Sequence, residues 1–247
     1  MSNRIVLVTG ASRGIGAAVA RAFAAAGDRL VLHHRDSPEL VEKVRSSLPG
    51  DEHVVVQADL ADPRAIQSMV DGVAVTSGRI DVLVNNAGIY VEHDIAETSY
   101  EEWQQAWQRT LAVNLLGPAN LTWAAVRHMP EGGRIVNVSS RGAFRGEPRF
   151  PAYGASKAGL NSLGQSMARA LGPRGISVTT VAPGYVETDM AADVLTGPEG
   201  DEIRAQSPLG RVGTPEEVAA AVVYLASPEA TYASGAILDL NGASYLR

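Results

Sequence analysis

The stretch RIVLVTGASRGIG, residues 4–16, joins a short apolar run to a glycine-rich loop. Its glycines, Gly10, Gly14 and Gly16, have the spacing GxxxGxG, and a segment with helical periodicity follows them. A glycine loop between a strand and a helix lets the backbone approach a pyrophosphate, which then lies at the positive end of the helix dipole. A glycine motif alone is a weak signal, but here a strand and a helix flank it. The stretch therefore predicts a nucleotide-binding unit.

Apolar, β-branched runs alternate with helical periodicity along the whole chain. This alternation is typical of βαβ units, in which helices cover both faces of a parallel sheet. We therefore predict an α/β fold of the Rossmann type, with a doubly wound, mostly parallel sheet of seven strands, in a single domain over residues 1–247. The strands are expected at 4–9, 30–34, 53–57, 81–85, 134–138, 176–181 and 236–240, and the helices near 14–26, 37–47, 63–77, 99–129, 153–171 and 214–226. Residues 187–212 are expected to form either a mobile lid or a long surface connection.

Composition and charge limit the classes of function. Of the 247 residues, 45% are hydrophobic and 19% are charged, which is ordinary for a globular protein. A formal charge of −6 argues against a nucleic-acid partner, which needs a basic surface. The chain has no cysteine, so we expect no disulfide and no metal site, and a cytoplasmic location. The short apolar run before the glycine loop is interpreted as a strand and not as a signal peptide, and no run is long enough to imply a membrane.

The end of the second predicted strand bears on the choice of cofactor. NAD-binding folds place an acidic residue there, which accepts hydrogen bonds from the adenosine ribose, whereas this chain has His34 followed by Arg35. Arg13 of the glycine loop is placed to converge with Arg35, and two guanidinium groups suit a 2′-phosphate. The alternative is that both are solvated surface arginines. We expect NADPH/NADP+ in preference to NADH, although Asp36, one place further on, weakens the argument.

Polar residues downstream form a candidate catalytic set. Tyr153 and Lys157 are four residues apart, so a helix brings them to one face. A nearby ammonium group lowers the pKa of a phenol from about 10, and Tyr153 would then exchange a proton with a carbonyl or alcohol oxygen. Ser140 would donate a hydrogen bond to the same oxygen. Each residue alone also fits a helix surface or a strand end, but their order behind a nucleotide loop favours catalysis.

Asn114 precedes Pro118 by four residues within one predicted helix. Proline lacks the N–H group that would bond to the carbonyl of Asn114. That carbonyl is therefore expected to be free to hold a water molecule, and a simple proline kink is a compatible alternative.

Together these motifs resemble the short-chain dehydrogenase/reductase family, in its 3-oxoacyl-[acyl-carrier-protein]-reductase-like branch. The resemblance covers essentially the whole chain and includes NNAG at 85–88 and APGYVETDM at 182–190. It implies a small-molecule carbonyl or alcohol substrate, a homotetramer or homodimer, and catalytic roles for Asn114, Ser140, Tyr153 and Lys157, with the water on Asn114 extending a proton relay through Lys157. The cofactor-binding residues that it implies are Gly10, Ser12, Arg13, Gly14, Ile15, Gly16, His34, Arg35, Asp59, Leu60, Asn86, Ala87, Gly88, Tyr153, Lys157, Pro183, Gly184, Val186 and Thr188.

The chain departs from that branch where an acyl carrier protein would dock. Carrier proteins are acidic, so docking requires a basic patch, and this chain retains Arg174 but has Glu131 where the branch offers a second basic residue. We therefore expect free carbonyl compounds to be better substrates, with 3-oxoacyl-[acyl-carrier-protein] reductase as the alternative function. A non-catalytic nucleotide-binding homologue is a second alternative, which the presence of Ser140, Tyr153 and Lys157 disfavours.

The loop after Ser140 contains further candidates for substrate contact. Three arginines there either meet an anionic substrate group or are satisfied by Glu147 and solvent, and we favour the second interpretation. The arginines are Arg141, Arg145 and Arg149. A partly apolar pocket is expected from Phe144, Phe150 and Tyr185.

Overall fold

The computed structural model describes residues 4–247, which contain a seven-stranded sheet in the order β3-β2-β1-β4-β5-β6-β7. Each adjacent pair of strands is parallel. The strands are β1 (Ile5–Val8), β2 (Arg29–His34), β3 (Val54–Gln57), β4 (Val82–Asn85), β5 (Arg134–Val138), β6 (Ser177–Pro183) and β7 (Ile237–Leu240). The predicted Rossmann-type sheet is confirmed, with strand ends that shift by one or two residues.

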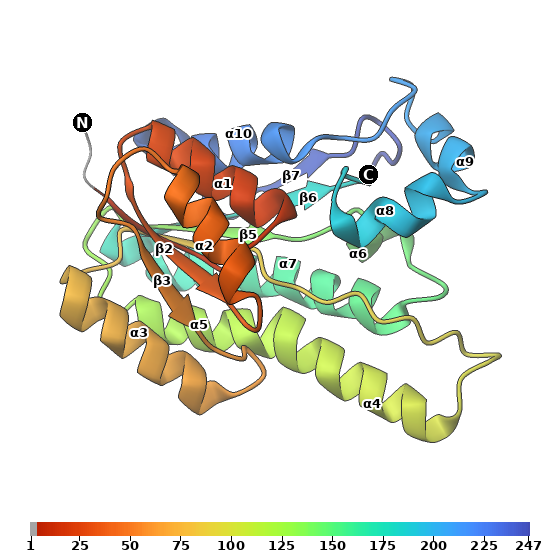
Figure 1. Ribbon diagram of the computed structural model, residues 1–247, viewed down its shortest axis with the longest axis horizontal. Helices are drawn as coiled ribbons and strands as arrows, with labels where there is room; N and C mark the ends of the chain where they lie inside the picture. Colours follow the sequence, from red (N-terminus) through yellow and green to blue (C-terminus); the bar gives the residue numbers. More distant parts are fainter. Residues whose placement is uncertain (1–3) are drawn as a thin grey trace.

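Helices cover both faces of the sheet (Figure 1). One face carries α1 (Gly14–Ala25), α2 (Pro38–Ser47) and α10 (Pro215–Leu225), and the other carries α3 (Pro63–Ser77), α5 (Gly117–Ala125) and α7 (Pro151–Leu171). Each strand contributes side chains to the core on both faces of the sheet, because successive side chains point to opposite faces. In β1, Val6 and Val8 belong to one buried cluster and Ile5 and Leu7 to the other.

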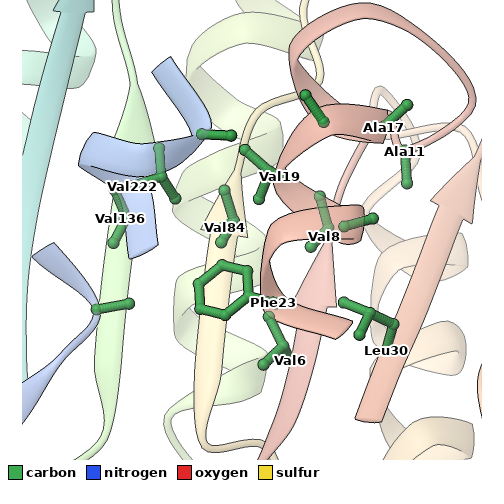
Figure 2. Close-up of a cluster of buried hydrophobic side chains, with 14 of the residues drawn as sticks. Val6, Val8, Ala11, Ala17, Val19, Phe23, Leu30, Val84, Val136 and Val222 are labelled. Carbon is green, nitrogen blue, oxygen red and sulfur yellow. The ribbon is translucent and has the colours of Figure 1, made fainter. Parts of the chain in front are cut away.

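Figure 2 shows the core that fixes α1 against the sheet. Phe23 of α1 is fully buried and lies in the same cluster as Val6, Val84, Val136 and Val222. Burying a phenylalanine side chain contributes roughly 1.5–3 kcal/mol. This packing sets the position of α1, and therefore of the glycine loop that leads into it.

The predicted helix over 99–129 is divided in the structure. It begins as α4 (Tyr100–Leu111), passes through a π-helical segment (Ala112–Leu116) and continues as α5, which ends at Ala125. In the π segment the N–H group of Gly117 donates to the carbonyl of Ala112, five residues earlier. Pro118 explains the change, because it cannot supply the N–H group for a regular bond to Asn114.

Residues 187–212 contain two short helices, α8 (Asp189–Thr196) and α9 (Gly200–Ala205). Ala191 and Leu195 of α8 pack with Ile203 of α9 and with Val212, which follows α9, in one small buried cluster. The remaining helical segments are α6 (Gly142–Arg145), η2 (Gly172–Arg174) and η3 (Pro228–Ala233). Over residues 4–247, no helix is both long and apolar enough to cross a membrane, and no cluster of His, Cys, Asp and Glu could hold a metal ion.

The strand order reverses between β1 and β4, which are neighbours in the sheet. In open α/β sheets a ligand crevice forms at such a switch point, at the carboxyl ends of the strands. The glycine loop follows β1 and the NNAG segment follows from the end of β4, so both lie at this crevice.

Candidate active site

The glycine loop is held by hydrogen bonds from the segments that neighbour β1. The N–H group of Gly10 donates to Nδ1 of His33 (3.1 Å), whose Nε2 lies 3.0 Å from the carbonyl oxygen of Ala58. Burial lowers the pKa of His33 to about 4, so the ring is neutral and Nε2 carries the proton that Ala58 accepts. From the other side, Nδ2 of Asn86 donates to the carbonyl oxygens of Thr9 (2.8 Å) and Gly10 (3.2 Å). The loop is therefore held on both sides.

The first turn of α1 presents its N–H groups to the crevice. Arg13 is the N-cap residue, in an extended conformation, and a guanidinium group has no acceptor for those N–H groups. Gly16 permits a close approach, because a Cβ there would lie 2.2 Å from the carbonyl oxygen of Gly10. Open N–H groups and the helix dipole favour an anion such as a pyrophosphate. These residues therefore fit a dinucleotide.

The two predicted arginines lie at one end of the cavity and share a carboxylate neighbour. Arg35 forms an ion pair with Asp36 at 2.5 Å, and Arg13 lies 3.8 Å from Asp189. The pKa of Asp36 is lowered mainly by its hydrogen bond with Arg35, and the charge of Arg13 lowers it further. The charges of both guanidinium groups thus reach Asp36 at the rim of the cavity. A ligand phosphate there would compete with Asp36 for Arg35.

His34 and Asp59 line the same end, and both side chains already have partners. His34 is buried, and its Nδ1 accepts a hydrogen bond from the N–H group of Ser37 (3.2 Å). Asp59 forms an ion pair with Arg109 of α4 (3.0 Å) and accepts a hydrogen bond from the N–H group of Ala61 (2.9 Å). These contacts hold the two side chains in place at the wall of the cavity.

The carboxyl end of β5 and the start of α7 bring Ser140, Tyr153 and Lys157 together. The Ser140 hydroxyl lines the same cavity as Tyr153 and lowers the pKa of the phenol. Nζ of Lys157 lies 5.7 Å from the centroid of the Tyr153 ring and donates to the carbonyl oxygen of Val138 (2.8 Å). Gly88 faces this group, since a Cβ there would lie 3.4 Å from Nζ of Lys157. The structure thus places three predicted catalytic residues side by side.

The protonation of Tyr153 differs from the expectation. Burial raises its pKa to about 12, which outweighs the lowering by the Ser140 hydroxyl, and the charge of Glu147 raises it further. Burial also lowers the pKa of Lys157 to about 8. The expected lowering of the phenol pKa is therefore wrong for this structure, because loss of hydration dominates at both groups. Tyr153 is a protonated phenol at neutral pH.

Asn114 lies behind the cavity wall, fully buried in the π-helical segment. Its Oδ1 accepts a hydrogen bond from the N–H group of Ile89 (2.8 Å), and its Nδ2 donates to the carbonyl oxygen of Ile89 (2.9 Å) and to Oγ of Ser156 (3.2 Å). The side chain therefore ties the segment after β4 to α7, beside Tyr153. The water expected on its backbone carbonyl stays a prediction.

One cavity of about 330 Å³ joins the two ends of the site. Every predicted cofactor-binding residue lines it, together with Ser140, and of the predicted catalytic residues Asn114 alone does not. Residues 188–191 also line it, so α8 forms part of the wall. Thr188 meets the glycine loop, because a Cβ on Gly14 would lie 3.1 Å from its Cγ2. The structure brings these residues together, and their contacts with a ligand stay a prediction.

The expected aromatic pocket differs in its members. Tyr185 lines the cavity as expected, and Tyr90 lines it too. Phe150 is stacked on Tyr90, with ring centroids 3.6 Å apart, and supports it from behind. Phe144 instead packs beneath the guanidinium group of Arg247. Tyr90 follows directly after the NNAG segment and Ile89, which is the one signal that pointed to it.

The three arginines after Ser140 have partners other than the expected Glu147 and solvent, and Arg141 lines the cavity. Whether any of them meets a substrate group stays a prediction. Arg141 donates to Oγ of Ser244 (2.6 Å) and to Oε1 of Gln206 (2.9 Å). Arg145 donates to the same oxygen of Gln206 (3.0 Å), and Arg149 forms an ion pair with Glu92.

His93 is a positioning residue that no sequence pattern predicted. It is 1% exposed, and its Nε2 accepts a hydrogen bond from the N–H group of Ala152 (3.1 Å), the neighbour of Tyr153. The main-chain N–H group of His93 donates to the carbonyl oxygen of Arg149 (2.9 Å). These bonds hold the first turn of α7 against the segment after β4. No local pattern in the sequence marks this role, because the contacts join residues about 60 positions apart.

Comparison with known proteins identifies relatives along the full chain. Residues 10–242 match the family model described as enoyl-(acyl carrier protein) reductase. The chain is 36% identical to 3-oxoacyl-[acyl-carrier-protein] reductase FabG of Vibrio cholerae, over 100% of this chain and 99% of that protein. It is 37% identical to D-threitol dehydrogenase of Mycolicibacterium smegmatis, over 98% and 93%. The structure of a short-chain dehydrogenase from Burkholderia cenocepacia in complex with NADP superposes with a TM-score of 0.91, at 37% identity over 98% of both chains.

Proposed function

The chain belongs to the short-chain dehydrogenase/reductase family of oxidoreductases, and from this premise we propose that it uses NADPH to reduce the carbonyl group of a small molecule to an alcohol. The observation that carries the proposal is the meeting of Ser140, Tyr153 and Lys157 at one end of a cavity whose other end is the glycine loop. Relatives crystallised with NADP or NADPH support the choice of cofactor.

The proton is supplied by Tyr153. When bound, NADPH supplies the hydride. The phenol of Tyr153, protonated at neutral pH, donates its proton to the carbonyl oxygen as negative charge develops there. The Ser140 hydroxyl orients the same oxygen by a hydrogen bond, and Lys157, anchored to Val138, keeps a positive charge beside the phenol below pH about 8. Asn114 and His93 hold the segments that carry these groups.

Cofactor preference tests the adenosine end of this proposal. Arg35→Ala should raise the KM for NADPH by about tenfold or more and leave the KM for NADH nearly unchanged, because a charge-assisted hydrogen bond to the 2′-phosphate contributes ~1–3 kcal/mol. Arg45→Ala is a matched control, since Arg45 is also an arginine paired with a nearby carboxylate, that of Glu42, but lies outside the cavity. Equal kcat/KM for NADPH and NADH in the parent enzyme would contradict the proposed role of Arg13 and Arg35.

Reduction of a carrier-bound substrate is the alternative function. Glu131 and Arg174 precede β5 and β6, so they lie at the amino edge of the sheet, whereas Ser140 follows the carboxyl end of β5. The five residues of β5 alone separate the two edges by about 16 Å. Glu131 also lies against Gly175, the residue after Arg174, since a Cβ on Gly175 would be 3.1 Å from the Cγ of Glu131. A negative charge in this region reduces the attraction for an acidic carrier.

We expect kcat/KM for an acetoacetyl group on a simple ester or a short thioester to equal or exceed that for the same group on acyl carrier protein. The reason is the acidic residue in the same region as Arg174, which weakens electrostatic docking. The measurement is initial-rate kinetics with NADPH on the two forms. A large advantage of the carrier-bound form that Arg174→Glu abolishes would return the protein to fatty-acid synthesis.

We also propose that the protein assembles as a homotetramer or homodimer, as the family resemblance implies. Large apolar side chains support this proposal, because Leu116 and Trp123 are more than half exposed at the helices of one face and Tyr232 is fully exposed. Such side chains mark candidate interfaces. Light scattering on the purified protein gives the mass that decides between these states and a monomer.

A further inference from the structure

The substrate end of the cavity contains a carboxyl group that the proposed proton transfer does not use. Glu147 lines the cavity together with Tyr90, Tyr153 and Tyr185. It is half-buried and fits closely against the backbone, since a Cβ on Gly142 would lie 2.6 Å from its Oε1. Its negative charge raises the pKa of all three tyrosines. The carboxyl group and the phenol that donates the proton therefore line the same cavity and interact electrostatically.

The arginines nearest to Glu147 hydrogen-bond elsewhere. The charges of Arg145 and Arg141 lower the pKa of Glu147, but burial raises it more. Both guanidinium groups donate to Oε1 of Gln206, at 3.0 and 2.9 Å. The hydroxyl of Tyr90 favours the charged form of Glu147 and so lowers its pKa, and a carboxylate can accept about four hydrogen bonds. Glu147 therefore keeps acceptor capacity for a molecule in the cavity.

Tyr90 adjoins both this acceptor and the phenol of Tyr153. Its ring stands edge-on to that of Tyr153, with centroids 4.7 Å apart, and is fixed from behind by Phe150. Glu147, Tyr90 and Tyr153 line the same cavity, so a substrate whose carbonyl oxygen meets Tyr153 could turn its neighbouring carbon toward Glu147. A hydroxyl group on that carbon would donate to the carboxylate, whereas an apolar group would leave a partly buried acceptor unpaired.

Resting on the proposed carbonyl reduction, we propose that Glu147 is a specificity-determining residue that selects carbonyl compounds with a hydroxyl group beside the carbonyl, and the corresponding vicinal diols in the reverse direction. The hydroxyl group donates a hydrogen bond to the carboxylate of Glu147. A substrate with a carboxylate in that place meets a like charge, and a plain ketone gains no bond there.

Matched ketones test this selection. The kcat/KM with NADPH is measured for acetoin and for 2-butanone, which differ by one hydroxyl group, in the parent, Glu147→Gln, Glu147→Leu and the control Glu92→Gln. Glu92 is an exposed carboxylate at the surface, paired with Arg149. The parent should favour acetoin by about tenfold or more, the ratio typical of one hydrogen bond to a charged group. Glu147→Leu should bring the ratio near unity, Glu147→Gln should lie between, and Glu92→Gln should match the parent.

A binding measurement separates this inference from the proposed function. With NADP+ present, 2,3-butanediol should raise the unfolding midpoint of the parent more than 2-butanol does, and Glu147→Leu should lose that difference. If neither ketone is reduced but the diol still binds in this Glu147-dependent way, Glu147 does select the neighbouring hydroxyl group, and it is the carbonyl-reductase proposal that fails. If both ketones are reduced equally well by the parent, or if Glu147→Leu keeps the preference for acetoin, the inference is overturned while the reductase proposal stands.

Discussion

Tyr153→Phe is expected to lower kcat for carbonyl reduction by about 10²–10⁴-fold, the range for loss of a positioned proton donor. The substitution removes only the phenol O–H group and keeps the ring that packs against Tyr90. The dissociation constant of NADPH should stay within a few-fold of the parent value. Stopped-flow or initial-rate kinetics at saturating NADPH, with NADPH binding followed by its fluorescence, gives both quantities.

Tyr185→Phe is the matched control for this prediction. Tyr185 lines the same cavity, and burial raises its pKa too, but it is Tyr153 whose pKa the Ser140 hydroxyl lowers. Loss of the Tyr185 hydroxyl should therefore change kcat by less than about tenfold. Near-normal turnover in Tyr153→Phe would overturn the assignment of the proton donor.

The direction of the pKa shifts also predicts a pH dependence. With a pKa of about 12, Tyr153 remains protonated across the ordinary assay range, so reduction needs no ionisation of the phenol. Alcohol oxidation needs the phenolate as base, and its rate should therefore rise with pH up to about 12. A fall in the oxidation rate with rising pH between 7 and 10 would contradict Tyr153 as the base.

The parts of the site that depend on short-range patterns could be predicted from the sequence. The glycine loop, the strand positions and the spacing of Tyr153 and Lys157 all follow from local periodicity and from the way parallel strands end at one edge of a sheet. For the helix over 99–129, the sequence predicted the lost hydrogen bond but not the π-helical segment that divides the helix. Pro118 predicts a lost bond to Asn114, but whether the helix kinks or forms a π-helical segment depends on packing.

The errors concern properties that arise only when distant segments meet. The pKa of Tyr153 was predicted from the nearby charge of Lys157, but burial of both groups against several segments decides it. His93 and Glu147 likewise act through contacts with residues on other elements. Burial among distant segments cannot be predicted from a local sequence pattern, so these roles could be assigned only from the structure.

The close packing around Gly16 predicts a large loss of stability and of NADPH affinity when this residue is substituted. A Cβ at this position would lie 2.2 Å from the carbonyl oxygen of Gly10 and 2.6 Å from Nδ2 of Asn86. Neither group can move freely, because Asn86 bonds to Thr9 and Gly10, and the N–H group of Gly10 bonds to His33. Gly16 lies within α1, where alanine is intrinsically favoured over glycine by up to about 1 kcal/mol. Overpacking by a methyl group costs roughly 1–3 kcal/mol and should exceed that gain.

Gly16→Ala should therefore lower the unfolding midpoint and raise the dissociation constant of NADPH by about tenfold or more, because the glycine loop must shift away from its hydrogen-bonding partners. Gly72→Ala is the matched control: Gly72 is exposed in the interior of α3, and a Cβ there meets nothing within 4 Å. This second variant should gain roughly 0.5–1 kcal/mol of stability and bind NADPH as the parent does. Thermal unfolding and fluorescence titration of both variants separate helix propensity from close packing. If Gly16→Ala binds NADPH with the parent affinity, the contact between Gly16 and Gly10 does not shape the cofactor site.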